Sequence, residues 1–321
     1  MPSNPSGSDQ HINALLTAVS VGYVQTDEKF VSRKVFPVVN VNKQSGRYAT
    51  YDRGDFLRDD ARRRAPGTES AGGGYGVSSS VFTAETYAFH RDVADEDRAH
   101  ADQPYDLDRD AAVFLAQKAL LKEEVQWAST FFTTGVWTGS STATDLVAGT
   151  DFIAWDDPAS TPIENISDQQ AEIESDTGVL ANVVVLNRRG WAALKNHPDV
   201  IDRVKHTSGE SVSTEIVARL MGVERILVAA GVRNTADTGA TAVTNYIVGN
   251  HALLAYAPSS PGLYVPASGY TFLNSAQSTD GQAVSTFRME WLKSDRHEIE
   301  WAFDQVAIAP LTGAFFSTIV T

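Results

Sequence analysis

The chain has 321 residues, 42% of them hydrophobic and 21% charged, which is the composition of a globular protein with room for two domains. Its formal net charge of −14 at pH 7 argues against broad binding to nucleic-acid phosphates, because that contact needs a basic face. There is no cysteine, so disulfides and thiolate metal sites are excluded, and no apolar run approaches the roughly 20 residues that span a bilayer.

The first part of the chain is polar and irregular. Residues 1–10 are rich in Pro, Ser, Asn and Gly, which predicts a mobile terminus. Apolar residues at helical spacing follow in 12–19, and they predict a short amphipathic helix that docks either on another molecule or on its own core. Residues 31–41 are β-branched and interrupted by Pro37, which favours an extended edge segment.

Residues 47–90 predict a long hairpin. Both ends are rich in strand-forming residues, whereas 52–76 between them is dense in Arg, Asp and Gly. A tip with so few apolar groups cannot offset the entropy of ordering it, so we expect it to remain in solvent or to lie on another molecule. The residues that we expect to contact such a partner are Asp59, Asp60, Arg62, Arg63 and Arg64.

The next segment, 90–110, accumulates aspartates. A metal site with His90 and His100 is conceivable, but the spacing matches no calcium or zinc pattern. Arginines also stand among the acids. We therefore predict a solvated or salt-bridged linker.

Residues 106–132 predict the helix around which the chain is organised. Apolar residues recur here at steps of three and four, interrupted only by Lys118, and a second apolar line lies beside them. The first line comprises Leu107, Ala111, Phe114, Leu121, Val125, Ala128 and Phe132. The residue type at position 106, Asp, favours an N-cap, and the helix would extend on the order of 40 Å at about 1.5 Å per residue.

Two acidic residues interrupt the apolar surface of this helix. Glu123 and Glu124 are expected to reach an arginine of the hairpin from a neighbouring chain, and simple solvent exposure is the alternative. Both interpretations place the two carboxylates on the outside of the subunit.

The second half of the chain alternates strands and helices. Four consecutive apolar residues in 183–186 predict a strand that is covered on both faces. Helices are expected in 163–175, 188–196 and 212–221, and strands in 225–230 and 246–256, which together predict an α/β domain. Late strands are expected to return to the long helix, and they cover 284–293, 298–303, 306–309 and 314–320.

No catalytic pattern is present in the sequence. No serine has a nucleophile-elbow context, and His297 with Glu298 lacks the second histidine of a zinc-protease helix. The glycines in 72–76 have neither dinucleotide-binding nor phosphate-loop spacing. We therefore expect no catalytic residue, no cofactor and no metal, and hence no enzyme activity.

Five segments, taken in order, resemble the major capsid proteins of tailed bacteriophages, whose fold is shared with encapsulins and the floor domain of herpesvirus capsids. They are DQPYDL (102–107), ANVVVLN (181–187), WAALKNHPDV (191–200), YIVGNHALLAYAP (246–258) and PGLYVPASGYTF (261–272). No single segment is diagnostic alone. Together, and in this order, the segments cover nearly the whole chain.

The resemblance implies an α+β capsid fold with named parts. Residues 1–46 would be the N-terminal arm and 47–91 the extended E-loop. The peripheral domain would comprise 92–179 and 284–321, with the spine helix at 106–132, and the α/β axial domain would be 180–283.

The resemblance also implies a function. Copies of the chain would assemble in the host cytoplasm as hexamers and pentamers of an icosahedral virion shell around double-stranded DNA. Scaffolding, portal and decoration proteins would be its further partners, and a membrane would not. Residues 47–90 contain no lysine, whereas some family members crosslink through an E-loop lysine, so we predict noncovalent joining. Because the arm begins near Met1, we expect a separate scaffolding protein or none.

Three other functions remain open from the sequence. An encapsulin would use the same fold as a cellular compartment, and the nucleic-acid content of particles distinguishes the two. A soluble α/β enzyme is disfavoured by the missing catalytic pattern. A tail or decoration protein is disfavoured because a long helix rarely accompanies a two-part domain plan in that class.

Overall fold

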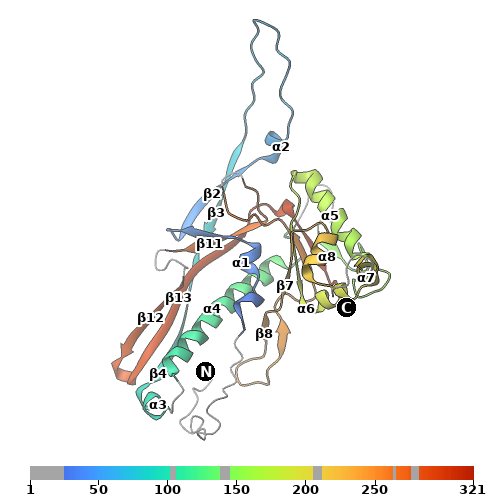
Figure 1. The fold of residues 1–321 in the computed structure, drawn as a ribbon. Helices are drawn as coiled ribbons and strands as arrows, with labels where there is room; N and C mark the ends of the chain where they lie inside the picture. Colours follow the sequence, from blue (N-terminus) through green and yellow to red (C-terminus); the bar gives the residue numbers. More distant parts are fainter. Residues whose placement is uncertain (1–24, 102–105, 138–144, 205–211, 263–264, 276–281) are drawn as a thin grey trace.

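The computed structural model describes residues 25–101, 106–137, 145–204, 212–262, 265–275 and 282–321. Two sheets stand side by side, a long helix lies along one of them, and a narrow hairpin projects from their junction (Figure 1). The amphipathic segment expected at 12–19 lies outside the described residues.

The first sheet is built around one long strand. Strand β13 pairs antiparallel with β11 and β12 along one edge and with β4 along the other, and β1 adds to β11 in parallel. The strands are β1 (Val38–Val41), β4 (Glu85–Ala94), β11 (Gly269–Asn274), β12 (Gln282–Met289) and β13 (Ser294–Ala307). Two of the expected late strands are therefore one continuous strand, and the expected edge segment contains β1, which pairs at the end of the sheet.

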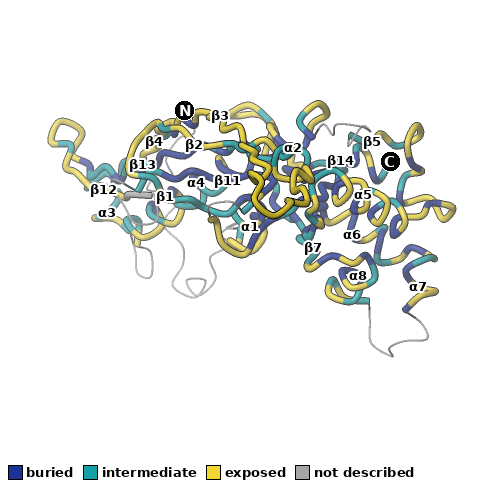
Figure 2. The backbone as a smooth tube through the Cα atoms, turned by 90° about the horizontal axis from the view of Figure 1, so that it is seen from above, coloured by how far each residue is buried: buried dark blue, intermediate teal, exposed yellow. Residues whose placement is uncertain are grey.

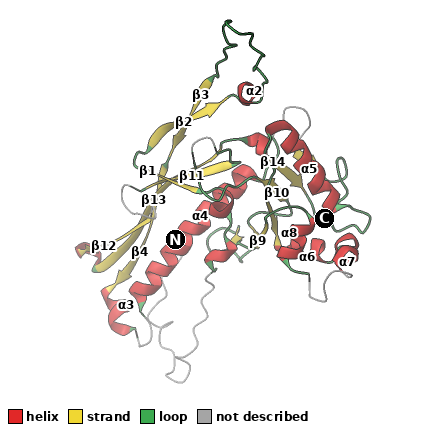
Figure 3. Ribbon diagram, turned by 45° about the horizontal axis from the view of Figure 1, so that its top comes forward, coloured by secondary structure: helices red, strands yellow, loops and turns green. Residues whose placement is uncertain are grey.

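The long helix α4 (Leu107–Phe131) covers one face of this sheet (Figure 3). Asp106 caps it as predicted, since its side chain accepts from the backbone N–H groups of Asp108 and Arg109. The predicted face is wrong near the start of the helix. Leu115 is fully buried against Ile299 and its neighbours on β13, whereas Phe114 is 37% exposed.

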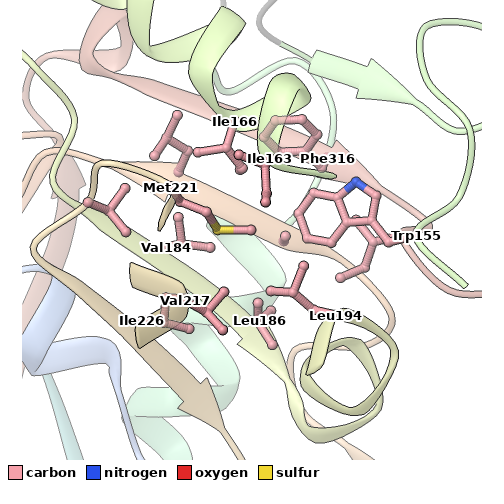
Figure 4. Close-up of a cluster of buried hydrophobic side chains, with 14 of the residues drawn as sticks. Trp155, Ile163, Ile166, Val184, Leu186, Leu194, Val217, Met221, Ile226 and Phe316 are labelled. Carbon is pink, nitrogen blue, oxygen red and sulfur yellow. The ribbon is translucent and has the colours of Figure 1, made fainter. Parts of the chain in front are cut away.

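The second sheet has the order β5-β14-β10-β6-β7 and carries helices on one face. Its strands are β5 (Asp145–Val147), β6 (Val183–Asn187), β7 (Arg225–Ala229), β10 (Ala252–Ala255) and β14 (Gly313–Ser317). Its helices are α5 (Pro162–Thr177), α6 (Arg188–Lys195), α7 (Pro198–Val204) and α8 (Thr214–Leu220). Figure 4 shows apolar side chains from α5, α6 and α8 meeting Val184 and Leu186 of β6.

The opposite face of the second sheet packs against α4. Val183 and Val185 of β6 share a buried cluster with Trp127 and Phe131 of the helix. Every residue of β6 is buried, so the predicted strand with both faces covered is confirmed. The helix therefore packs in two separate clusters, one against the first sheet and one, nearer its C-terminal end, against the second.

Strand pairing divides the chain differently from the expected domain boundaries. Strands β5 and β14, expected in the peripheral domain, pair into the second sheet, and α5 packs on that sheet. Strand β11, expected in the axial domain, pairs with β13 of the first sheet. The domain boundaries stay a prediction, and the pairing across them was not predictable because apolar runs predict strands but not which strands pair.

The remaining elements are short. The projecting hairpin is formed by β2 (Ser45–Tyr51) and β3 (Val77–Thr83), which pair antiparallel, with the single helical turn α2 (Arg53–Phe56) beside them. A second small hairpin joins β8 (Val232–Asn234) and β9 (Thr244–Tyr246). The other pieces are η2 (Asp27–Lys29), α1 (Ser32–Val35), α3 (Asp95–His100), η3 (Glu290–Leu292) and η4 (Pro310–Thr312).

Candidate interaction surface

The β2–β3 hairpin presents an exposed surface that the subunit itself does not cover. Every residue from 56 to 81 is exposed, as the end-on view in Figure 2 also shows. The five predicted contact residues lie in this stretch, and their side chains make no ion pair with any residue that the structure describes. They are Asp59, Asp60, Arg62, Arg63 and Arg64. The structure thus leaves them accessible, and their contact with a second chain stays a prediction.

An aromatic patch lies near the base of the hairpin. The rings of Tyr51, Phe56 and Tyr75 contact one another at centroid distances of 5.5 to 6.0 Å. Phe56 is 54% exposed and Tyr75 is 60% exposed, with Leu57 exposed beside them. Exposed apolar clusters of this kind mark protein–protein contacts. The sequence did not predict this patch, because its three aromatic residues are separated by a charged, glycine-rich segment and show no periodic spacing.

The base of the hairpin is tied to the body at α2. Asp52 caps this turn through the N–H of Gly54 at 2.8 Å, and Asp55 accepts from the N–H of Gly76 at 2.8 Å. Arg53 donates to the backbone carbonyl of Asp176 at the C-terminal end of α5. The hairpin therefore emerges from the junction of the two sheets.

Glu123 and Glu124 are buried within the subunit, which corrects the expectation that both carboxylates lie on its outside. The carboxylate of Glu124 is 1% exposed and accepts the N–H groups of Val31 and Ser32 at 2.9 to 3.1 Å. Glu123 forms a bidentate pair with Arg33 at 2.7 Å. Both acids thus fasten the segment around α1 to α4 within one chain.

The burial of Glu124 changes its titration. Removal from solvent raises the pKa of Glu124 above its ordinary value, and the N–H donors of Ser32 and Val31 only partly oppose that rise. The apolar spacing of the helix could not identify these residues as buried, because their partners come from a segment about 90 residues away.

Of the two predicted alternatives, a solvated or a salt-bridged linker, the acidic segment after the hairpin is salt-bridged. Asp92 pairs with Arg296 at 2.7 Å, and Asp95 pairs with Arg288 at 2.5 Å. Arg98 reaches both Asp108 and Asp295 at 2.8 Å. Within the described ranges, no group of three or more acidic, histidine or cysteine residues is placed to hold a metal ion.

These ion pairs also shift the pKa values of the aspartates that take part in them. Hydrogen bonds from Arg296 and Arg98 lower the pKa of Asp92 and of Asp108 below the ordinary range. Hydrogen bonds from Arg288 do the same to the pKa of Asp95 and of Asp295. The four carboxylates are therefore ionised in the folded subunit at neutral pH.

The far end of the first sheet carries a second exposed apolar point that sequence reasoning missed. Trp291 in the turn between β12 and β13 is 81% exposed, and Leu292 beside it is also exposed. The signal in the sequence was the apolar pair Trp291 and Leu292 between the charged residues Glu290 and Lys293. The β2–β3 hairpin and this turn thus both expose large apolar side chains.

The sequence and the fold were compared with those of known proteins. No family model matches the chain. The major capsid protein of Burkholderia phage BcepMu is 23% identical over 296 residues, covering 88% of this chain and 90% of that protein. The major capsid protein of Pseudomonas phage JBD67 is 25% identical over 252 residues, with 76% and 77% covered.

Solved structures share the fold. A phage-related protein of Bordetella bronchiseptica superposes with a TM-score of 0.69 at 20% identity, over 92% of this chain and 94% of the other. The capsid of cyanophage P-SCSP1u superposes with a TM-score of 0.64 at 13% identity, over 96% and 93%. The chain has the fold of a phage major capsid protein. In that fold's vocabulary, α4 is the spine helix and the β2–β3 hairpin is the E-loop.

The capsid fold is also used outside virions. An encapsulin complex of Synechococcus elongatus has a TM-score of 0.51 at 8% identity, with 96% of both chains covered. That similarity is weaker than the similarity to the cyanophage capsid. No helix among the described residues has the length and apolar character needed to cross a membrane.

Proposed function

We propose that this chain is the major capsid protein of a tailed bacteriophage. Its copies join as hexamers and pentamers into an icosahedral virion shell, assembled in the host cytoplasm, that encloses double-stranded DNA. The observation that carries the proposal is the exposed E-loop, in which every residue from 56 to 81 is exposed and the rings of Phe56 and Tyr75 are 54% and 60% exposed. The similarity to two phage major capsid proteins over most of the chain supports the same conclusion.

The E-loop supplies the contact in this proposal. Its tip carries Asp59 and Asp60 followed by Arg62, Arg63 and Arg64, and adjacent groups of opposite charge suit a partner surface of mixed charge. The aromatic patch supplies apolar area at the base of the same contact. A subunit that completes its packing only on a neighbour is suited to build closed rings.

The net charge of −14 suits a container for DNA. An acidic shell is repelled by duplex phosphate, so the proximity of packaged DNA to the shell is nonspecific. Portal and decoration proteins, and a separate scaffolding protein if one is used, are further partners in this proposal. The role is structural, and no catalysis is assigned to the chain.

Electron microscopy of the purified full-length chain tests the proposal. The chain is concentrated with and without a crowding polymer, and the products are examined by negative-stain imaging and sedimentation. Closed shells of a defined diameter, or isolated five- and six-membered rings, are the expected products. A chain that remains monomeric under all of these conditions would contradict the proposal.

A cellular compartment of the encapsulin kind is the second candidate, favoured by the shared fold. The two functions differ in cargo. Particles recovered from infected or induced cells contain nuclease-protected double-stranded DNA if the chain is a phage capsid protein. Particles that contain only a protein cargo support the compartment instead.

A further inference from the structure

The E-loop is attached to the first sheet by a small set of aromatic contacts, which we call the aromatic clip: Gly46, Phe82 and Phe272. Phe82 is the one buried residue of β3. Its ring stacks on Phe272 of β11 with centroids 4.3 Å apart and planes 12° from parallel. On the other side, a Cβ at Gly46 would come within 2.7 Å of the Phe82 ring. The ring is held between a glycine and a second aromatic ring.

The clip lies on the face of the sheet opposite to the spine helix. Phe272 belongs to a cluster with Tyr270 and Phe82, whereas the adjacent Leu273 packs with the side chains that face α4. Successive residues of a strand point to opposite faces, so the two neighbours separate the two layers. The E-loop base and the spine helix therefore cover opposite faces of one sheet.

Two hydrogen bonds follow immediately after the clip. The N–H of Thr83 donates to the carboxylate of Asp304 on β13 at 2.8 Å. The N–H of Ala84 donates to the carbonyl of Gln44 at 2.7 Å, and Ala84 is fully buried. They fix the point at which the chain leaves the E-loop and enters β4. Beyond α2, residues 57–75 are exposed throughout.

A second attachment lies on the other side of the E-loop base. Arg53 of α2 donates to the backbone carbonyl of Asp176 at the end of α5. One attachment thus goes to the first sheet and the other to the helix layer of the second. Attachments at two separate points of the body leave the base of the E-loop little freedom to rotate.

We infer that the aromatic clip holds the E-loop at one fixed angle in the unassembled subunit. Phe82 is the positioning residue, and Gly46 is required because any side chain there would displace the ring. The fixed angle is a property of the single chain. That the angle preorganises the E-loop for a second copy of this chain rests on the proposed function. A preorganised arm loses less conformational entropy on association than one that a neighbour must order.

Distance measurements between two spin labels test the fixed angle. The chain has no cysteine, so Ser78→Cys on β3 and Glu172→Cys on α5 place labels at exposed positions without background. The labelled full-length chain is mixed with excess unlabelled chain, so that intersubunit distances do not contribute. The otherwise unchanged sequence is expected to give one narrow distance distribution.

The clip variants are compared in the same labelled background. Phe82→Ala and Gly46→Val are expected to broaden the distribution at least twofold. Val81→Ala, on the neighbouring exposed position of β3, is the matched control and leaves it narrow. Circular dichroism and the melting temperature establish that each variant is folded, and shell yield is measured in parallel.

Each outcome decides the inference. A broad distribution in the otherwise unchanged chain overturns it even if both clip variants fail to fold. So does a distribution that stays narrow in folded Phe82→Ala or Gly46→Val. A narrow distribution that broadens in those variants supports the fixed angle whether or not shells form. Failure to form shells bears on the proposed function alone.

Discussion

The buried pair Glu123 and Glu124 is the clearest feature at the scale of single residues. Glu124 gives two backbone N–H groups at the start of α1 a buried acceptor, and Glu123 binds the guanidinium of Arg33. A carboxylate inside a protein is tolerated when its oxygens accept hydrogen bonds. The two residues thus join the chain that leads out of the N-terminal arm to the spine helix.

Replacing Glu124 should therefore weaken folding. In Glu124→Leu the two N–H groups lose their acceptor, and we expect unfolding to become easier by about 1–3 kcal/mol. Glu124→Gln keeps one oxygen and should cost less. Urea unfolding followed by circular dichroism measures both, with the exposed Glu172→Gln on α5 as the control. A Glu124→Leu chain as stable as the control would mean that this contact contributes nothing.

The stability of the subunit should pass through a maximum in weak acid. Burial raises the pKa of Glu124 and of Asp304, so the folded chain takes up protons that the unfolded chain does not, and stability rises as pH falls from neutral through those raised values. Arg296 and Arg98 lower the pKa of Asp92 and of Asp108 from the ordinary 3.8. Their contribution is present above about pH 4 and is lost as pH falls through the lowered values.

Thermal unfolding of the unassembled subunit between pH 3 and 8 measures this profile. Glu124→Gln should flatten the rise on the neutral side and leave the acid loss unchanged. A melting temperature that increases steadily from pH 5 to pH 8 would be inconsistent with the assigned burial of these carboxylates.

At the scale of elements, the spine helix shows what periodicity can and cannot predict. Its extent, its N-cap at Asp106 and its central place were all predictable from spacing and residue type. Its buried face was not, because β13 and the segment around α1 pack on it from different sides and select Leu115, Ala119 and the two glutamates. Phe114 instead lies beside Phe89, with Lys118 over its ring at 5.2 Å.

Substitutions at two neighbouring positions of the helix distinguish its observed buried face from the predicted one. Leu115→Asp places an unpaired charge in the core, which costs several kcal/mol, about enough to unfold the subunit. Phe114→Asp, one position away, should remain folded. Soluble yield and circular dichroism measure the difference. Leu121 lies on the predicted apolar face but is only half-buried. The soluble yield of Leu121→Asp should therefore lie between those of the other two variants.

A substitution at the exposed tip of the E-loop tests assembly without disturbing the fold of the subunit. Arg63→Glu reverses one charge at the exposed tip, so we expect shell yield to drop severalfold while the melting temperature stays within about a degree. Arg189→Glu makes the same charge change at an exposed position on α6 and is the control. Equal shell yields for the two variants would remove the E-loop tip from the contact.

The whole molecule was more predictable in its parts than in their connections. The long hairpin, the central helix and the strand buried on both faces follow from composition and period. The exchange of β11 and β14 between the sheets does not, because pairing joins strands far apart in sequence. The aromatic patch on the E-loop was missed because its three rings are separated by up to 24 positions and meet only in the folded hairpin.

Particles should be held together without covalent links between subunits. Residues 47–90 contain no lysine, so the E-loop cannot supply the amine for an isopeptide bond. Boiled particles should therefore run as a single band near 34.7 kDa in denaturing electrophoresis. A ladder of higher bands would show that a lysine elsewhere in the chain takes part.

The spine helix packs on the first sheet through Leu115 and on β6 of the second through Trp127 and Phe131, which has a mechanical consequence. Bending the subunit between its sheets would pull these interlocked side chains apart, so the body must behave as one stiff plate. In a curved shell, plates of this kind meet at different tilts around five-fold and six-fold positions. The differences in tilt must therefore be accommodated at the contacts between subunits and in the extended segments, such as the E-loop, that reach across them.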